Sequence, residues 1–217
     1  MSAILYRQKL DVAPRALVSN TYTDMQKLQI TVVLGTARNE RSSLKVSDVA
    51  MHLIGTNETV NATHVDVRDY AFTKTEPGWE ESSIAQPWRE IVQKTDGFLF
   101  IIPEYNRSFP GELKLLLDSE SPKNYNKRAA AIVAVSSGAY GGARVVTSIQ
   151  PVLSELGLVH TNKPLLVQRV NELFEHSDEE AVKRSESFER NFSSSFDELL
   201  WYSQLLKRGR EEGSAPE

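Results

Sequence analysis

The sequence predicts an α/β fold, a doubly wound, five-stranded parallel sheet with helices on both faces. Short β-branched runs alternate with longer segments of helical period from residue 28 to residue 208, which is typical of parallel strands joined by crossover helices. The run 97–102 is apolar on both faces, as expected for a central strand covered by helices on either side. Hydrophobic residues make up 40% of the 217 residues and charged residues 25%, a composition typical of a folded globular protein.

The strands and helices are expected in regular order. The expected strands cover residues 29–34, 64–67, 97–102, 129–135 and 165–167. The expected helices cover residues 44–54, 86–95, a segment opened by Pro110, 143–156 and 178–207. Gly55 follows the first helix and Pro87 lies in the first turn of the second, positions that these residues favour. We therefore expect one domain over residues 28–208, between an N-terminal arm (1–27) and a disordered tail (209–217).

The composition excludes several classes of function. Cysteine is absent, which removes disulfides, thiolate metal sites and thiol nucleophiles. The four histidines are scattered without ligand spacing, so we expect no metal site. A formal net charge of −4 provides no electrostatic footprint for nucleic acid or for an anionic membrane. We expect neither of these partners.

The sequence shows no run typical of a membrane-spanning helix. No apolar run approaches the roughly 20 residues that a spanning helix needs, so we expect a soluble, cytoplasmic protein. The first 25 residues are basic and contain hydroxyl groups, as in an organelle-targeting peptide. Because Pro14 breaks an amphipathic helix there, we favour an arm that packs on this domain or on a neighbouring subunit.

The loop after the first strand has the composition of an anion site. It contains Gly35, Thr36, Arg38, Arg41 and Ser42 just before a helix, where backbone amides and the helix dipole favour a phosphate. Glycine permits close approach, the hydroxyls can donate and the arginines can neutralise charge. Taken alone, such a loop is equally typical of a capping serine with solvated arginines. Its place after the first strand favours the phosphate.

The same loop indicates which phosphate compound binds. It contains neither the G-x-G-x-x-G fingerprint of dinucleotide sites nor the P-loop pattern. A loop that relies on hydroxyls suits one monophosphate, and the flavodoxin-like version of the doubly wound fold binds FMN at its switch point. FMN is therefore the leading ligand.

The loop after the third strand contains a specific signature. Pro103, Glu104, Tyr105 and Asn106 are followed by Ser-Phe-Pro-Gly. This run resembles the P-E-Y-N signature of the NADPH-dependent FMN reductase family, which includes quinone reductases and azoreductases. The resemblance implies that these four residues contact the isoalloxazine ring.

The loop after the fourth strand is rich in glycine and serine. Its candidate residues are Ser136, Ser137, Gly138, Tyr140 and Gly141. Taken alone, the loop is more typical of a plain connection in which glycine permits a positive φ. It nevertheless resembles the family's glycine-rich loop beside the pyrimidine edge of the flavin, and the first loop resembles the family's G-S-x-R phosphate loop. The resemblance covers about residues 30–167.

The sequence and the resemblance together predict an enzyme. It would be an FMN-dependent oxidoreductase that takes hydride from NADPH or NADH and reduces a small-molecule acceptor such as a quinone or azo compound in ping-pong order. No protein side chain is assigned a catalytic role, because the flavin performs the chemistry. The resemblance implies a homodimer or a higher homo-oligomer. Two alternatives stay open: a flavodoxin-type electron carrier or flavin-binding regulatory module, and a flavin-free binding scaffold.

Overall fold

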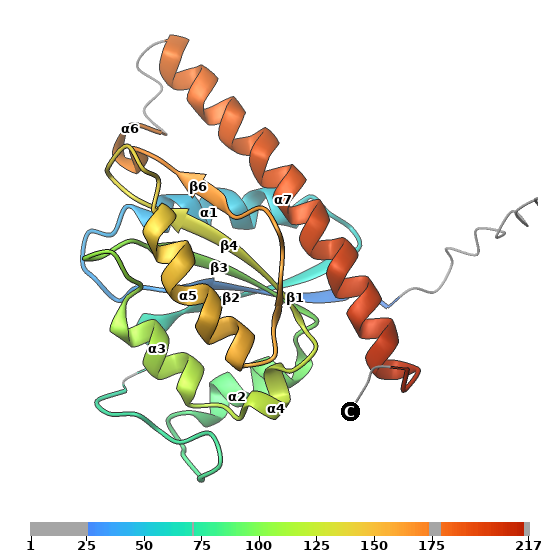
Figure 1. Cartoon of the computed structure of the whole chain (residues 1–217). Helices are drawn as coiled ribbons and strands as arrows, with labels where there is room; N and C mark the ends of the chain where they lie inside the picture. The colour runs from blue at the N-terminus through green and yellow to red at the C-terminus, as the bar shows by residue number, and fades with distance from the viewer. Residues whose placement is uncertain (1–25, 71, 174–178, 215–217) are drawn as a thin grey trace, which may run out of the picture.

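The protein folds around one parallel sheet, shown in Figure 1. The computed structural model describes residues 26–70, 72–173 and 179–214. The strands are β1 (Leu28–Leu34), β2 (Val60–Asp66), β3 (Gly97–Pro103), β4 (Ala129–Val135), β5 (Val159–His160) and β6 (Leu165–Val167). Their order is β2-β1-β3-β4-β5, with β6 also paired to β4, and every pairing is parallel. The predicted flavodoxin-like doubly wound sheet is confirmed.

Two strands differ from the prediction for identifiable reasons. The fifth position of the sheet holds two short strands, β5 and β6, because Pro164 lies between them and has no N–H to donate to β4. β2 begins at Val60, four residues earlier than predicted. Asn61, Thr63 and His64 lie on this edge strand and are not fully buried. The first residues of β2 therefore do not form an apolar run from which its beginning could be predicted.

Helices cover both faces of the sheet. They are α1 (Ser43–Gly55), α2 (Gln86–Lys94), α3 (Gly111–Asp118), α4 (Pro122–Tyr125), α5 (Ala143–Glu155), α6 (Val170–Leu173) and α7 (Glu179–Glu211). A short 3₁₀ turn, η1 (Val67–Asp69), follows β2. The five predicted helices are present, whereas the single turns η1, α4 and α6 were not predicted because they are too short to show a period.

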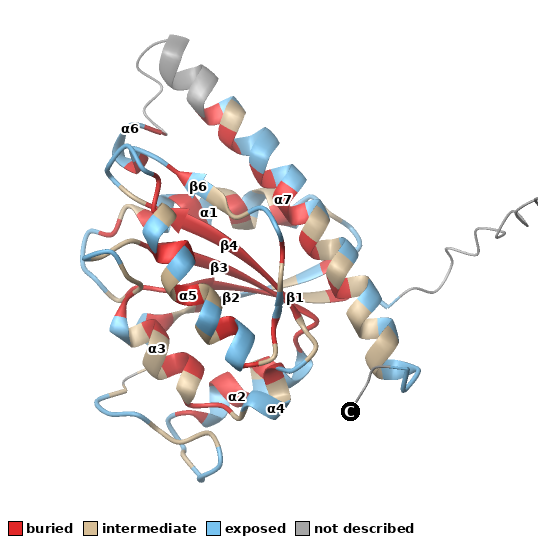
Figure 2. Cartoon of the chain, in the orientation of Figure 1, coloured by how far each residue is buried: buried red, intermediate tan, exposed pale blue. Residues whose placement is uncertain are grey.

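The sheet separates two apolar cores. On one face, α1 and the aromatic stripe of α7 pack against β1, β3 and β4, and on the other face α2, α3, α4 and α5 pack against the same strands. Figure 2 shows the buried strands between the two helical layers. Phe188, Phe192 and Phe196 are all buried in the first core. Trp88 is fully buried in the second, whereas Trp79 is 81% exposed.

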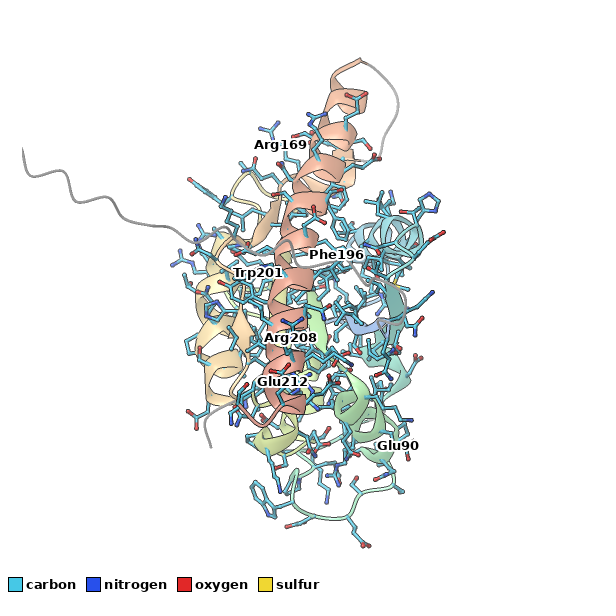
Figure 3. The ribbon with its side chains drawn as sticks, turned by 90° about the vertical axis from the view of Figure 1, so that its right-hand side faces the viewer. Glu90, Arg169, Phe196, Trp201, Arg208 and Glu212 are labelled. Atoms are coloured by element: carbon cyan, nitrogen blue, oxygen red, sulfur yellow. The ribbon has the colours of Figure 1, made fainter. Side chains whose placement is uncertain are left out.

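The long C-terminal helix α7 lies along the sheet, as Figure 3 shows from its solvent side. It approaches β3 so closely that a Cβ on Gly97 would lie 2.2 Å from Ser203 Oγ. The helix continues to Glu211, beyond its predicted end at residue 207 and into the predicted disordered tail (209–217). It continues because Arg210 donates to Asp96 Oδ1 (2.9 Å) and to Lys127 O (2.6 Å). Most of the predicted arm (1–25) and the end of the tail (215–217) lie outside the described residues.

Candidate functional site

Three loops meet at the carboxyl edge of the sheet, on the left of Figure 1. They follow β1, β3 and β4 and enclose a cleft of about 290 Å³ together with the start of α6. The predicted site residues that line it are Arg38, Arg41, Ser42, Pro103, Glu104, Tyr105, Ser136 and Ser137. The others, which lie in the same loops but do not line it, are Gly35, Thr36, Asn106, Gly138, Tyr140 and Gly141. Their contacts explain the difference.

The loop after β1 begins tightly packed on β3 and α3. The Gly35 N–H donates to Ile101 O (2.9 Å), and a Cβ at this position would lie 3.0 Å from Leu113 Cδ2. Thr36 is fully buried, and its hydroxyl lies 3.2 Å from both Tyr105 Oη and Glu112 Oε1. Both residues therefore hold the loop in place instead of facing the cleft.

Arg41 is buried in this loop and paired with a residue from β2. Its guanidinium donates to both carboxylate oxygens of Asp66 and to the backbone oxygen of Thr36. Burial raises the pKa of the Asp66 carboxyl group, but hydrogen bonds from Arg41 and the Arg68 amide, with the two positive charges, outweigh burial and hold it below its ordinary value. Arg41 was predicted to neutralise a phosphate; Asp66 already balances its charge.

Two polar groups at the beginning of α1 nevertheless lack partners. Arg41 Nε and Ser43 Oγ are buried without a hydrogen bond from any described residue, although both side chains line the cleft. An unpaired buried donor costs about 1–3 kcal/mol. An anion at this helix N-terminus would satisfy both donors, and the helix dipole would favour it.

Arg38 provides the exposed positive charge of the loop. Its side chain is exposed, and its guanidinium carbon lies 5.4 Å from the centre of the Tyr105 ring. Ser42, which was also predicted to meet a phosphate, instead donates to Asn171 Oδ1 on α6. Asn171 and the neighbouring Val170 both line the cleft.

The loop after β3 turns back as a tight hairpin. Tyr105 and Ser108 exchange backbone hydrogen bonds of 2.9 and 3.0 Å, while Asn106 and Arg107 have φ values of 50° and 70°. This is a two-residue turn of the type in which asparagine tolerates a positive φ. Asn106 lies at its exposed tip. The turn holds the Tyr105 ring at the cleft.

Glu104 connects this hairpin to the loop after β4. Its carboxylate accepts the Arg144 N–H (3.1 Å) and the Arg144 guanidinium (3.0 Å), and the same guanidinium lies 5.2 Å from the centre of the Tyr140 ring. Tyr140 is 70% exposed. Gly141 and Gly142 have φ values of 60° and 77° with neighbouring atoms in the way of a Cβ, so the glycines of this loop have a backbone role.

Sequence reasoning missed several residues that shape the site. Arg68, just after β2, donates to the backbone oxygens of Ala37 and Arg38 and so fixes the first loop from outside. Glu40, Val170 and Asn171 line the cleft. The position of Arg68 at the carboxyl end of a strand beside β1 was the one available signal, since the carboxyl ends of parallel strands meet at one edge.

The geometry fits a flat ligand with a single phosphate. Arg38, Arg41 Nε and Ser43 Oγ supply donors at one side of the cleft, and the Tyr105 ring supplies an aromatic surface beside them. Within the described parts of the chain, no cluster of three or more histidine, aspartate or glutamate side chains could hold a metal ion. Likewise, none of the helices in those parts is long and apolar enough to cross a membrane.

Comparison with known proteins shows the family to which the chain belongs. The sequence pattern of the NADPH-dependent FMN reductase family matches residues 28–171. A probable NADPH:quinone oxidoreductase 2 from Oryza sativa subsp. japonica is 38% identical over 105 residues, 46% of this chain and 51% of the relative. A 2-hydroxy-1,4-benzoquinone reductase from Burkholderia sp is 27% identical over 63% of this chain and 76% of the relative. The match thus spans about half the length of the rice protein.

Solved structures support the fold. An NADH:FMN oxidoreductase in its apo form superimposes with a TM-score of 0.60 at 18% identity, over 78% of this chain and 90% of that one. A flavoenzyme NAD(P)H:(acceptor) oxidoreductase from Paracoccus denitrificans superimposes with a TM-score of 0.58 at 19% identity, over 77% and 98%. At these identities the likeness shows a common architecture.

Proposed function

Because the chain belongs to the NADPH-dependent FMN reductase family and is therefore an oxidoreductase, we propose that it binds FMN in the cleft and transfers hydride from NAD(P)H to a quinone. Quinone reduction is what the names of the rice and Burkholderia relatives specify. The observation that supports this proposal best is the pair of buried, unpartnered donors, Arg41 Nε and Ser43 Oγ, at the N-terminus of α1.

In this proposal, different residues of the cleft bind different parts of FMN. Arg38, Arg41 Nε and Ser43 Oγ would hold the phosphate, Tyr105 would orient the ring, and the Glu104–Arg144 pair fixes the loops on either side. FMN would supply the hydride-transfer chemistry, so no protein side chain has to act as nucleophile. If the loops after β1, β3 and β4 cover one side of the ring, donor and acceptor would use the remaining side in turn.

The test is an activity and binding measurement on the purified full chain. We expect FMN, and not FAD, to bind, and we expect NADPH or NADH to be oxidised when 1,4-benzoquinone is present. Parallel double-reciprocal plots are expected for substrates that share one face, whereas intersecting plots would contradict sharing. Absence of NAD(P)H oxidation by the FMN-loaded protein would favour the electron-carrier alternative, and absence of flavin binding would overturn the proposal.

We also propose that the enzyme acts in the cytoplasm as a homodimer or a larger homo-oligomer. The exposed side chains of Trp201 (59%) and Leu205 (45%), about one turn apart on α7, support an assembly, because neighbouring apolar groups at a surface favour contact with a partner. Light scattering coupled to size-exclusion chromatography measures the number of subunits. A monomer at micromolar concentration would contradict the second half of this proposal.

A further inference from the structure

Glu112 contacts the proposed phosphate loop although it does not line the cleft. Pro110 precedes α3, Gly111 is the first residue of the helix, and Glu112 follows in its first turn. Its Oε1 accepts the Ala37 N–H at 2.8 Å and the Thr36 hydroxyl at 3.2 Å. A half-buried carboxylate thus bonds to two groups of a loop that lies 75 residues earlier in the chain.

The donors and acceptors around Thr36 can be assigned completely. A threonine hydroxyl has one proton and two lone pairs. Its proton goes to Glu112 Oε1, which accepts only, and one lone pair takes the Arg38 N–H at 3.2 Å. The hydroxyl of Tyr105, also at 3.2 Å, must then donate to the second lone pair. The carboxylate of Glu112 therefore fixes the direction of every hydrogen bond in this group.

This network joins the two loops that hold opposite ends of the proposed ligand. Arg38 carries the free positive charge for the phosphate, and Tyr105 presents the aromatic surface. Both bond to the same hydroxyl, and the Arg38 guanidinium lies 5.4 Å from the Tyr105 ring centre. Loss of Glu112 would remove the acceptor of the Ala37 N–H and the Thr36 hydroxyl and so loosen the phosphate loop. The Tyr105 hairpin would keep its own backbone hydrogen bonds to Ser108.

We propose that Glu112 is a positioning residue that couples the phosphate loop to the Tyr105 hairpin and so sets the preference of the cleft for a phosphorylated flavin. The inference rests on the proposed function, because it presupposes FMN in the cleft. It differs from an ordinary helix-end role, in which an acidic residue in a first turn interacts with the helix dipole and stabilises the helix alone. A helix-end role would leave ligand selectivity unchanged.

The test compares FMN with riboflavin, which lacks the phosphate. Dissociation constants for both are measured by quenching of flavin fluorescence on the full-length wild type, Glu112→Ala and Glu112→Gln. We expect Glu112→Ala to weaken FMN about tenfold, the size of one lost hydrogen bond to a charged group, and to change riboflavin binding less than about threefold. Glu112→Gln keeps an acceptor oxygen and should remain near the wild type.

Two further variants separate positioning from general damage. Glu90→Ala removes an exposed acid of α2 that accepts a hydrogen bond from Gln86 and does not line the cleft. This variant should leave both constants unchanged. Thr36→Val removes the shared hydroxyl with little change in volume. It should lower the FMN preference as Glu112→Ala does, and combining the two changes should add little, because both break the same connection.

The outcomes are distinct. Failure of the wild type to bind FMN would overturn the proposed function itself. If the wild type binds FMN but Glu112→Ala leaves the ratio of the two constants unchanged, or weakens both flavins equally, the coupling is wrong while the proposed function stands. Should Glu112→Ala fail to fold, Thr36→Val decides the matter, since an unaltered FMN-to-riboflavin ratio in that variant contradicts the network.

Discussion

The two ends of the sheet use buried charges in different ways. At the amino edge, Asp96 is 5% exposed and its carboxylate accepts from Lys207 Nζ, Arg210 Nη2 and the Gln29 N–H at 2.9 to 3.0 Å. At the carboxyl edge, Asp66 pairs with Arg41. However, Arg41 Nε and the hydroxyl of Ser43 have no hydrogen-bond partner among the described residues. The first cluster ties α7 to the sheet, whereas the second leaves donors unsatisfied.

The backbone shows the same contrast. Among the described residues, five that are not glycine have a positive φ, and four of these follow strands at the carboxyl edge: Glu40, Asn106, Arg107 and Arg169. Such conformations cost of order 1–3 kcal/mol each. Positive-φ residues thus gather where a ligand is proposed. Two of the four buried polar atoms without a partner in the described residues also lie there, whereas Glu120 Oε2 and Ser203 Oγ lie elsewhere. The comparison indicates that the amino edge serves stability, whereas the carboxyl edge serves both stability and the proposed binding.

The largest expected effect is at the amino edge. Asp96→Asn would remove the buried counter-charge of Lys207 and Arg210, which are both largely buried. Among the described residues, Lys207 would keep only the exposed Glu211 carboxylate, at 3.5 Å. We expect a loss of about 4 kcal/mol in the free energy of unfolding, the usual cost of breaking a buried ion pair. Denaturant unfolding measures this loss. The FMN dissociation constant, measured at a temperature where the variant is folded, should not change. A large change would show that the amino edge also affects binding.

Asp66→Asn at the carboxyl edge should affect both properties. Loss of the charge opposite the buried Arg41 is expected to cost about 3 kcal/mol of stability and to weaken FMN, because Arg41 Nε moves with its side chain. The pKa of the Asp66 carboxyl group lies below its ordinary value of 3.8 when folded. Its contribution is therefore complete above about pH 4 and disappears as the pH falls through the folded pKa.

The control for this pH dependence is the variant itself. Unfolding free energies are compared between pH 3 and pH 6 for the wild type and Asp66→Asn. The difference between the two proteins should shrink as acid protonates Asp66 in the wild type. A difference that stays constant over this range would show that the ion pair does not set the acid stability of the loop.

Arg38→Ala should separate binding from stability most cleanly. We expect FMN affinity to fall by about 1.5–3 kcal/mol, the usual size of a hydrogen bond to a charged group. The free energy of unfolding should be nearly unchanged because the side chain is exposed. Lys45→Ala, which removes an exposed cation of α1 that does not line the cleft, is the matched control. If both variants lower the FMN affinity equally, Arg38 contributes only through its general positive charge and not through a direct contact with the phosphate.

The smallest expected effect is a gain. Glu40 lines the cleft with a φ of 51°, and its carboxylate has no hydrogen bond or ion pair in the described structure. Glu40→Gly should raise stability by about 1 kcal/mol, because glycine adopts this conformation without strain, and should tighten FMN by removing a negative charge near the phosphate. Glu40→Gln tests the charge alone. If neither variant tightens FMN, the phosphate lies away from Glu40.

Much of the fold could be predicted because its signals are local. β4 was predicted with its observed bounds, since Ala129–Val135 is apolar throughout and buried on both faces. β2 was found only in part because an edge strand has exposed positions. The end of α7 was misplaced because the partner that holds Arg210, Asp96, lies 114 residues away.

The sequence by itself determined the order of strands and helices, and with it the gathering of three loops at one edge, because parallel strands place their carboxyl ends together. It also identified the P-E-Y-N run and the first loop as candidates. The tertiary structure decided which polar groups in those loops remain available. Arg41 is occupied by Asp66, Thr36 by Glu112 and Ser42 by Asn171, which lie 25, 76 and 129 residues further along the chain. A polar group forms a hydrogen bond with a suitable partner that the fold places within about 3 Å. The separation of the two residues in the sequence does not limit which partner this is.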